Sequence, residues 1–188
     1  MQIIYLILFG YLLGAIPTGK IIGKIKGIDI QKKGSGNIGF ANAVRVLGWK
    51  AGSIVLIGDI AKGFIPVFIA RYYFDATLYQ QMIIGIAPII GHAYPVWLRF
   101  KGGKSIATGL GVLLALNAQV ALAGVLLYLF VFSVSKKSAI GSLAAAWMLP
   151  IIALCIQPNY FAYLCLLAIF ATYTHRVNIK QLIHERLP

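Results

Sequence analysis

Acidic residues are scarce in this sequence of 188 residues, which has 4 Asp and Glu residues against 17 Lys and Arg residues. So few carboxylates cannot build a two-metal site, and we expect neither a metal nor a cofactor. Charged residues of both signs make up only 11%, where a soluble domain has about 25%. Hydrophobic residues make up 60%. These proportions exclude an ordinary soluble domain.

Two familiar catalytic arrangements are also missing. Both cysteines lie inside apolar stretches, where a thiol packs as a small hydrophobic group. No histidine has an aspartate five residues later, since Trp97 and Lys180 occupy that position after His92 and His175. This excludes the usual His-x4-Asp motif of acyl-CoA-dependent glycerolipid acyltransferases.

Apolar stretches fill most of the chain. They cover residues 3–22, 46–72, 78–98, 105–116, 118–134, 139–156 and 160–174. Because a helix of about 20 apolar residues crosses a bilayer, we expect an all-α polytopic protein with about seven transmembrane helices, some of them short or interrupted by proline. We expect residues 1–188 to form one integral membrane domain, with a turn near Asn117 dividing the region 105–134 into a hairpin.

The basic residues are concentrated in four of the connections between these stretches, at 20–50, 99–104, 136–137 and 176–186. The other connections, near Asp75, Asn117 and 157–159, are almost bare. The positive-inside rule then places the N-terminus outside and the C-terminus in the cytoplasm. Since the rule accounts for the net charge of +13, we expect no nucleic-acid partner.

A first motif combines glycines with small polar residues and an arginine. Its members are Gly34, Ser35, Gly36, Asn37, Gly39, Asn42 and Arg45. Glycines let backbone N–H groups surround an anion closely, and a guanidinium can hold a phosphate with two donors. The motif predicts a phosphate-binding loop. The alternative is a flexible loop whose lysines contact anionic lipid.

A second motif, Gly102-Gly103-Lys104 before Ser105, is not a P-loop, because Leu98 stands where that pattern requires glycine. We expect a helix to begin at Ser105, with its N-terminus and Lys104 binding phosphate. The alternative for Lys104 is an ordinary lysine that extends toward the membrane surface.

Ionisable residues also occur within apolar stretches. Asp59 and Lys62 lie three residues apart, on one helix face. Because an unpaired charge there costs roughly 2.5–3.5 kcal/mol, we expect these two to pair inside the bundle, in a supporting or purely structural role. His92 stands alone in its helix, and we expect it to be a packed, hydrogen-bonded residue.

The last apolar stretch is followed by His175, Arg176 and Asn178. We expect these residues to reach the same membrane interface as the two glycine motifs. Ser138 and Ser142, at the start of the 139–156 stretch, are further candidates for binding phosphate.

In order and spacing, these motifs resemble the bacterial acyl-phosphate:glycerol-3-phosphate acyltransferases, integral membrane enzymes of phospholipid synthesis. The resemblance rests on three blocks: Gly34 to Gly39 with Asn42, Arg45, Gly48, Asp59, Lys62, Gly63 and Pro66; Gly91-His92 with Pro95, Phe100 to Lys104, Ala107 and Thr108; and His175-Arg176 with Asn178, Ile179 and Leu182. The sequence departs from the family pattern at Phe40-Ala41, Ser105, Gln181, Glu185 and Leu187.

The resemblance implies transfer of a fatty acyl group from acyl phosphate to the 1-hydroxyl of glycerol 3-phosphate, giving lysophosphatidate and phosphate. It implies a site on the cytoplasmic face of the bacterial inner membrane, and the enzyme that makes acyl phosphate is a candidate partner. An acyl phosphate is already activated, so positioning and charge stabilisation can supply most of the acceleration.

On this interpretation the catalytic residues are Ser35, His175 and Asn178. Ser35 and its loop hold one phosphate and stabilise the oxyanion, while His175 and Asn178 orient glycerol 3-phosphate. Arg45 and Lys104 hold phosphate. The sequence leaves open which of these residues binds the phosphate of acyl phosphate and which binds that of glycerol 3-phosphate. His175 or a substrate phosphate oxygen takes the proton.

Two other functions fit the same composition. An organophosphate or anion transporter also places glycine loops and cations near broken helices. However, the polar residues gather on one face of this chain, whereas transport needs access from both. A non-enzymatic membrane subunit would have lost some of Ser35, Arg45, Lys104 and His175, and all four are present.

Overall fold

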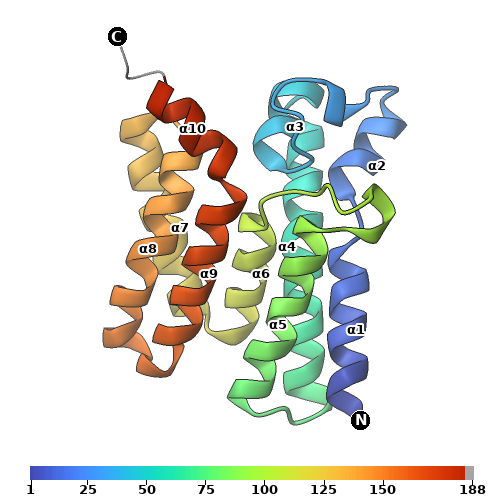
Figure 1. Ribbon diagram of the computed structural model, residues 1–188. Coiled ribbons are helices and arrows are strands. Elements are labelled where there is room, and N and C mark those ends of the chain that lie inside the picture. Colours follow the sequence, from blue (N-terminus) through green and yellow to red (C-terminus); the bar gives the residue numbers. More distant parts are fainter. Residues whose placement is uncertain (185–188) are drawn as a thin grey trace. The chain divides into compact units, whose positions relative to one another are not determined.

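The computed structural model describes residues 1–184, and all regular secondary structure in this range is helical (Figure 1). The helices are α1 (Gln2–Gly14), α2 (Thr18–Ile25), α3 (Phe40–Leu47), α4 (Trp49–Tyr73), α5 (Leu78–Ala93), α6 (Ile106–Leu116), α7 (Ala118–Ser135), α8 (Ser138–Ile156), α9 (Phe161–Thr174) and α10 (Arg176–His184), with short 3-10 helices η1 (Ile30–Lys32), η2 (Val96–Leu98) and η3 (Pro158–Tyr160). The all-α class predicted from the sequence is confirmed for the described residues.

Five segments are long and apolar enough to cross a membrane: Gln2–Ile25, Trp49–Tyr73, Leu78–Leu98, Ala118–Ser135 and Ser138–Ile156. The two other predicted spans are shorter, since α6 has 11 residues and α9 has 14. At about 1.5 Å per residue, neither reaches across a core of ~30 Å without further residues. A polytopic membrane protein follows from the five long helices, and the number seven stays a prediction.

Two boundaries differ from the sequence prediction. The expected span 3–22 is two helices, because Pro17 lies between α1 and α2 and has no N–H to donate to the preceding turn. The expected span beginning at Val46 is also divided. Gly48, at φ +86°, ends α3 and precedes α4. Each break leaves a short helix near the glycine motifs.

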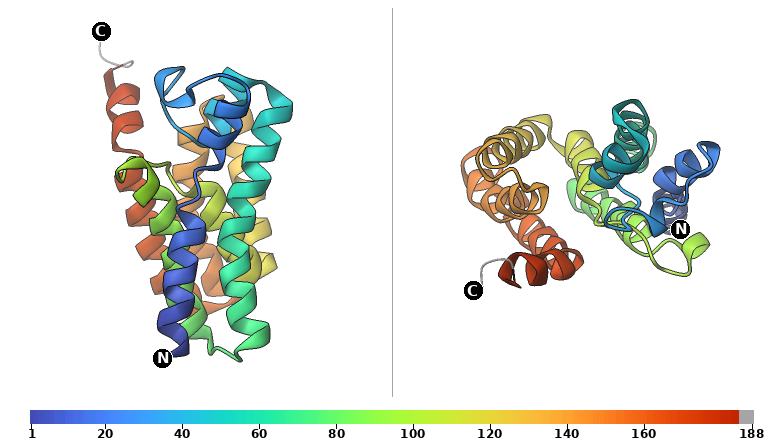
Figure 2. Two further views of the ribbon diagram at one scale, coloured as in Figure 1. Left: turned by 90° about the vertical axis from the view of Figure 1, so that its right-hand side faces the viewer. Right: turned by 90° about the horizontal axis from the view of Figure 1, so that it is seen from above.

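The chain divides into two compact units, Met1–Leu116 and a second that begins at Asn117. In the first unit α4 packs on α6 and α1 packs on α5 (Figure 2). Glycines make the first of these contacts close: a Cβ on Gly63 would collide with the carbonyl oxygen of Thr108, and one on Gly111 with that of Ile60. Such small-residue contacts are the usual way for membrane helices to pack without a hydrophobic driving force.

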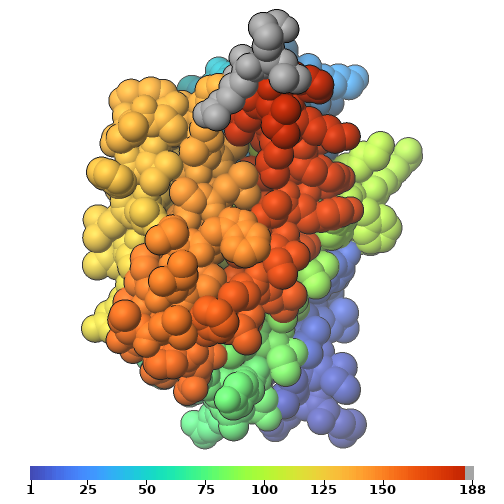
Figure 3. Space-filling view, turned by 60° about the vertical axis from the view of Figure 1, so that its left-hand side comes forward, coloured from blue at the N-terminus to red at the C-terminus, as the bar shows by residue number. Residues whose placement is uncertain are grey.

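In the second unit α8 packs against both α7 and α9. The predicted break near residue 117 is confirmed, since the Asn117 side chain caps α7 by accepting from the N–H groups of Gln119 and Val120 at 2.9 and 3.1 Å. Figure 3 looks onto this unit. Exposed large side chains on it include Leu126, Phe130, Trp147, Ile151, Leu154 and Ile169. These side chains suit contact with lipid tails.

Candidate functional site

The first motif is a tight loop held together by one asparagine. Gly34 and Gly36 both have positive φ, +59° and +70°, which glycine adopts without strain. The Asn42 amide donates to the carbonyl oxygens of Ile30, Lys33 and Asn37 at 3.2, 3.1 and 2.9 Å. Its oxygen accepts from the Ser35 N–H at 2.9 Å. Asn42 is buried, and its side chain uses these hydrogen bonds to hold the loop in shape.

Several backbone N–H groups of this loop are already bonded within the protein. Besides Ser35, Gly36 donates to the carbonyl of Lys33 at 3.1 Å, and Gly39 donates to the Asn37 side chain at 2.9 Å. The loop therefore offers a smaller anion nest than its glycines predict. The Ser35 side chain lies on the exposed surface, where its hydroxyl is accessible to a ligand.

Arg45 is carried by α3, the short helix that follows the loop, and it is exposed. Asn42 lies one turn earlier on the same helix and points into the protein. The short helix therefore carries both the buried amide that fixes the loop and, one turn later, an exposed guanidinium.

The second motif lies in an unusual stretch of backbone. Arg99, Phe100 and Ser105 have positive φ of +51°, +61° and +63°, although none is glycine. The helix α6 was expected to begin at Ser105. It begins one residue later, at Ile106, so that Ser105 directly precedes it. The Ser105 hydroxyl donates to the carbonyl oxygen of Ile89 on α5 at 2.7 Å, and this buried bond anchors the stretch.

The two motifs come together at one end of the first unit, the end away from Met1 (Figure 1). The Gln31 amide donates to the Lys101 carbonyl oxygen at 3.2 Å and its oxygen accepts from Lys20 at 2.6 Å. Beneath them Leu98 packs against the buried cluster that contains Ile30 and Ile38. Sequence reasoning missed Gln31, because nothing in the pattern signals a contact across 70 positions.

The charge at this end is mainly positive. Lys33, Arg45 and Lys101 are exposed, and the acidic residue near them, Asp29, is 3.6 Å from Lys20. Lys104 is half-buried, and burial lowers the pKa of its amine below the ordinary value of 10.5. An anion beside Lys104 would favour the charged form and so be bound by it.

The predicted Asp59–Lys62 pair is confirmed. The two side chains are buried on α4, with Lys62 Nζ 2.8 Å from Asp59 Oδ1. Lys62 also donates to the Ile16 carbonyl oxygen at 3.0 Å. His92 is buried as predicted, but its Nδ1 has no hydrogen-bond partner and faces Asp59 Oδ1 at 3.7 Å. The expectation of a hydrogen-bonded ring is therefore wrong at Nδ1.

In the second unit His175 lies at the junction of α9 and α10, as expected from its place after the last apolar stretch. It is buried, and Nδ1 is 2.8 Å from the Ala171 carbonyl oxygen. Because that carbonyl can only accept, Nδ1 carries the proton and a neutral ring keeps its lone pair on Nε2. Asn178 is half-buried, one turn further along α10.

The other candidates of the second unit differ in exposure. Arg176 is exposed, donates to the Tyr173 carbonyl at 3.0 Å and lies over the Tyr173 ring at 4.5 Å. Ser142 is buried in α8, and the Ser138 hydroxyl is 3.0 Å from that of Tyr128. Two of the departures from the family pattern, Glu185 and Leu187, lie outside the described residues.

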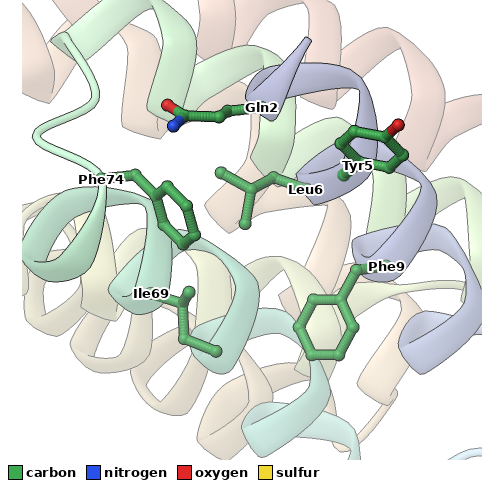
Figure 4. A pocket seen from close by; sticks show the side chains of 6 residues that line it. All are labelled: Gln2, Tyr5, Leu6, Phe9, Ile69 and Phe74. Atoms are coloured by element: carbon green, nitrogen blue, oxygen red, sulfur yellow. The ribbon is translucent and has the colours of Figure 1, made fainter.

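An apolar groove lies in the first unit between the start of α1 and the end of α4 (Figure 4). Gln2, Tyr5, Leu6, Phe9, Ile69 and Phe74 line it. Since it lies near Met1, it is at the other end of the unit from the glycine motifs, and its lining suits lipid tails rather than phosphate.

Known proteins resemble this chain over almost its whole length. The sequence profile of the glycerol-3-phosphate acyltransferase family matches residues 4–185. Among relatives, the glycerol-3-phosphate acyltransferase of Myxococcus xanthus (strain DK1622) is 44% identical over 180 residues, which is 94% of either chain. That of Aquifex aeolicus (strain VF5) is 38% identical over 189 residues, covering 99% of this chain and 98% of the relative.

Two solved structures share the fold. Both are crystal structures of PlsY (YgiH), an integral membrane glycerol 3-phosphate acyltransferase, one in its glycerol 3-phosphate form and one in its lysophosphatidic acid form. Their TM-scores are 0.91 and 0.89, each at 35% identity, covering 100% of this chain and 95% of the solved chain.

Proposed function

The chain belongs to the glycerol-3-phosphate acyltransferase family, and we propose that it transfers an acyl group from acyl phosphate to the 1-hydroxyl of sn-glycerol 3-phosphate. The observation that carries the proposal is the match to PlsY, whose solved forms hold substrate and product of this acylation. The products are lysophosphatidate and inorganic phosphate.

The chemistry suits the residues present. The glycerol hydroxyl attacks the acyl carbonyl carbon, a C–O bond forms, and the bond from the acyl carbon to the phosphate oxygen breaks. Phosphate is a good leaving group, so the protein has to hold two anionic reactants together and stabilise the oxyanion. The cationic end of the first unit, with Lys33, Arg45 and Lys104, supports this role.

In the first unit we assign Ser35 to a phosphate and to the developing oxyanion, through its exposed hydroxyl. Arg45 and Lys104 hold phosphate groups, Arg45 with two parallel donors and Lys104 as a point charge. Gly34, Gly36, Asn37, Gly39 and Asn42 set the shape of the loop, and Gly102 and Gly103 that of the Lys104 segment.

In the second unit we assign His175 and Asn178 to orienting glycerol 3-phosphate, with Arg176 in support. The two candidate acceptors of the hydroxyl proton are the His175 imidazole and a phosphate oxygen of the substrate. Ser142 and Ser138 are assigned to a phosphate.

We further propose seven membrane crossings, an external N-terminus and a site on the cytoplasmic face of the bacterial inner membrane. The clustering of basic residues in four connections supports this topology. The two compact units would then act as one acyltransferase domain, receiving acyl phosphate from the enzyme that makes it.

The test is product formation by the purified protein in lipid. Acyl phosphate and glycerol 3-phosphate should give lysophosphatidate with release of one phosphate per product, while acyl-CoA in a parallel reaction should give none. If acyl-CoA gave product and acyl phosphate gave none, acyl phosphate would not be the donor. No product from either donor would contradict the proposed reaction.

A further inference from the structure

We infer that His92, packed beside the buried Asp59–Lys62 pair, is a positioning residue for the segment that carries Lys104. The inference rests on the proposed role of Lys104 in binding phosphate. On this inference the buried charges of α4, Asp59 and Lys62, pair with each other and also contribute to substrate affinity.

The cluster ties three parts of the first unit together. Asp59 and Lys62 come from α4, His92 comes from α5, and Lys62 reaches the carbonyl oxygen of Ile16 in the connection between α1 and α2. The side chains are 4% exposed or less. Charged groups buried so deeply are held in one geometry, since losing a partner is costly. Asp59 Oδ1 lies 3.7 Å from His92 Nδ1, too far for a hydrogen bond, so it is packing beside the pair that sets the side on which the imidazole ring lies.

The opposite edge of the ring lies against the second motif. A Cβ placed on Gly103 would collide with His92 Nε2, and would lie 2.8 and 2.9 Å from ring carbons Cδ2 and Cε1. The same stretch is tied to the backbone of α5, because Gly103 donates to the His92 carbonyl at 3.0 Å and Gly102 to that of Ala93 at 3.1 Å. Residue 103 therefore rests on the ring, and the next residue is Lys104.

The contact explains why position 103 needs glycine although its φ is not positive. A side chain would push either the ring away from Asp59 or the segment away from α5. Either shift moves the Lys104 amine relative to the bound phosphate and weakens their charge-assisted contact, which lowers substrate affinity. His92 touches no reacting atom in this scheme and acts only through residue 103.

A double-mutant cycle tests the inference. His92→Ala, Gly103→Ala and the double variant are reconstituted in lipid, with Gly109→Ala as the matched control because a Cβ at Gly109 meets nothing within 4 Å. The readouts are KM and kcat for glycerol 3-phosphate, equilibrium binding of labelled glycerol 3-phosphate, and the melting temperature.

Either single variant should raise KM about tenfold with kcat within about twofold, while the control matches the wild type. In the His92→Ala background the added methyl has room, so Gly103→Ala should raise KM by less than about twofold more. If the two losses multiply instead, His92 does not act on residue 103 and the inference is wrong. A fall in melting temperature with unchanged KM and binding would overturn it as well.

The binding readout separates this inference from the proposed function. Wild-type protein that binds glycerol 3-phosphate, shows the coupling and forms no product would contradict the proposed reaction alone. If Gly103→Ala does not fold, His92→Ala by itself must still weaken binding of labelled glycerol 3-phosphate about tenfold, and normal binding would overturn the inference.

Discussion

Arg45 is the residue whose chemistry links the first motif to phosphate most simply. It is exposed on α3 and one turn from Asn42, which fixes the loop. Asn42 was expected to bind substrate, and its four bonds to the loop give it a shaping role instead. The sequence predicted that Asn42 and Arg45 belong to the same motif. It could not predict that Asn42 shapes the loop while Arg45 is exposed, because that depends on the orientation of α3 in the fold.

Arg45→Ala should raise KM for glycerol 3-phosphate or acyl phosphate by about 10- to 100-fold, because a hydrogen bond to a charged group contributes about 1.5–3 kcal/mol. The KM of Arg45→Lys should lie between those of the wild type and Arg45→Ala, since lysine keeps the charge but lacks the paired donors. Steady-state kinetics on both substrates measures the effect, with the exposed Lys50→Ala as a control. An Arg45→Ala enzyme with wild-type affinity and turnover would remove Arg45 from the site.

Lys104 should make substrate affinity depend on pH. Burial lowers the pKa of its amine, so the charge is lost as the pH rises through a value below that of a free lysine. Affinity for phosphate is therefore present below that pKa and falls above it. Lys104→Arg keeps its charge, and its KM should stay flat over the alkaline range where the wild-type KM rises. Parallel alkaline limbs in the two KM profiles would contradict this assignment.

Ser105 combines backbone strain with a stabilising bond. Its φ of +63° disfavours a residue with a Cβ, while its hydroxyl bonds to Ile89 at 2.7 Å. Ser105→Ala keeps the strain and loses the bond, and Ser105→Gly loses both. We expect the alanine variant to be less stable than the glycine variant by about 1 kcal/mol in detergent unfolding. The reverse order would show that the backbone here is not strained.

At the scale of the helices, hydropathy located most of the elements. The α6–α7 break at Asn117 and the long helices α4, α5 and α8 were predictable from apolar length and the residues that bound them. The short helices α2, α3 and α10 were not, because each has polar residues that a membrane-span pattern passes over. Contacts between distant residues, such as Gln31 with Lys101, leave no local signal.

The close contact of α4 and α6 makes a prediction at this scale. Gly63→Ala should destabilise the protein by about 1–3 kcal/mol, because the methyl would collide with the Thr108 carbonyl oxygen of a well-packed interface. Gly109→Ala on α6 meets open space and should be neutral or mildly stabilising. Unfolding in detergent measures both. Equal stability of the two variants would mean that α4 and α6 can separate without cost.

For the whole molecule, the distribution of charge was the most informative property of the sequence. Most of the basic residues in the described chain lie at connections and helix ends, whereas Lys62 is buried within the long helix α4, where it pairs with the acidic residue Asp59. Composition and motifs therefore predicted the class and the family. The roles of the second-unit residues His175 and Asn178 in catalysis stay a prediction. Those roles depend on tertiary contacts, which the spacing of residues in the sequence does not encode.

The measurement that tests the central claim most directly uses sealed vesicles of one orientation. Labelling of Lys101→Cys by a membrane-impermeant reagent, in a Cys155→Ala, Cys165→Ala background, reports the orientation. Labelled glycerol 3-phosphate is then supplied only on the side of the basic connections, with acyl phosphate in the membrane. The account predicts lysophosphatidate in the bilayer and no labelled glycerol 3-phosphate across it. Accumulation of unmodified glycerol 3-phosphate on the far side, without product, would contradict the enzyme and indicate a transporter.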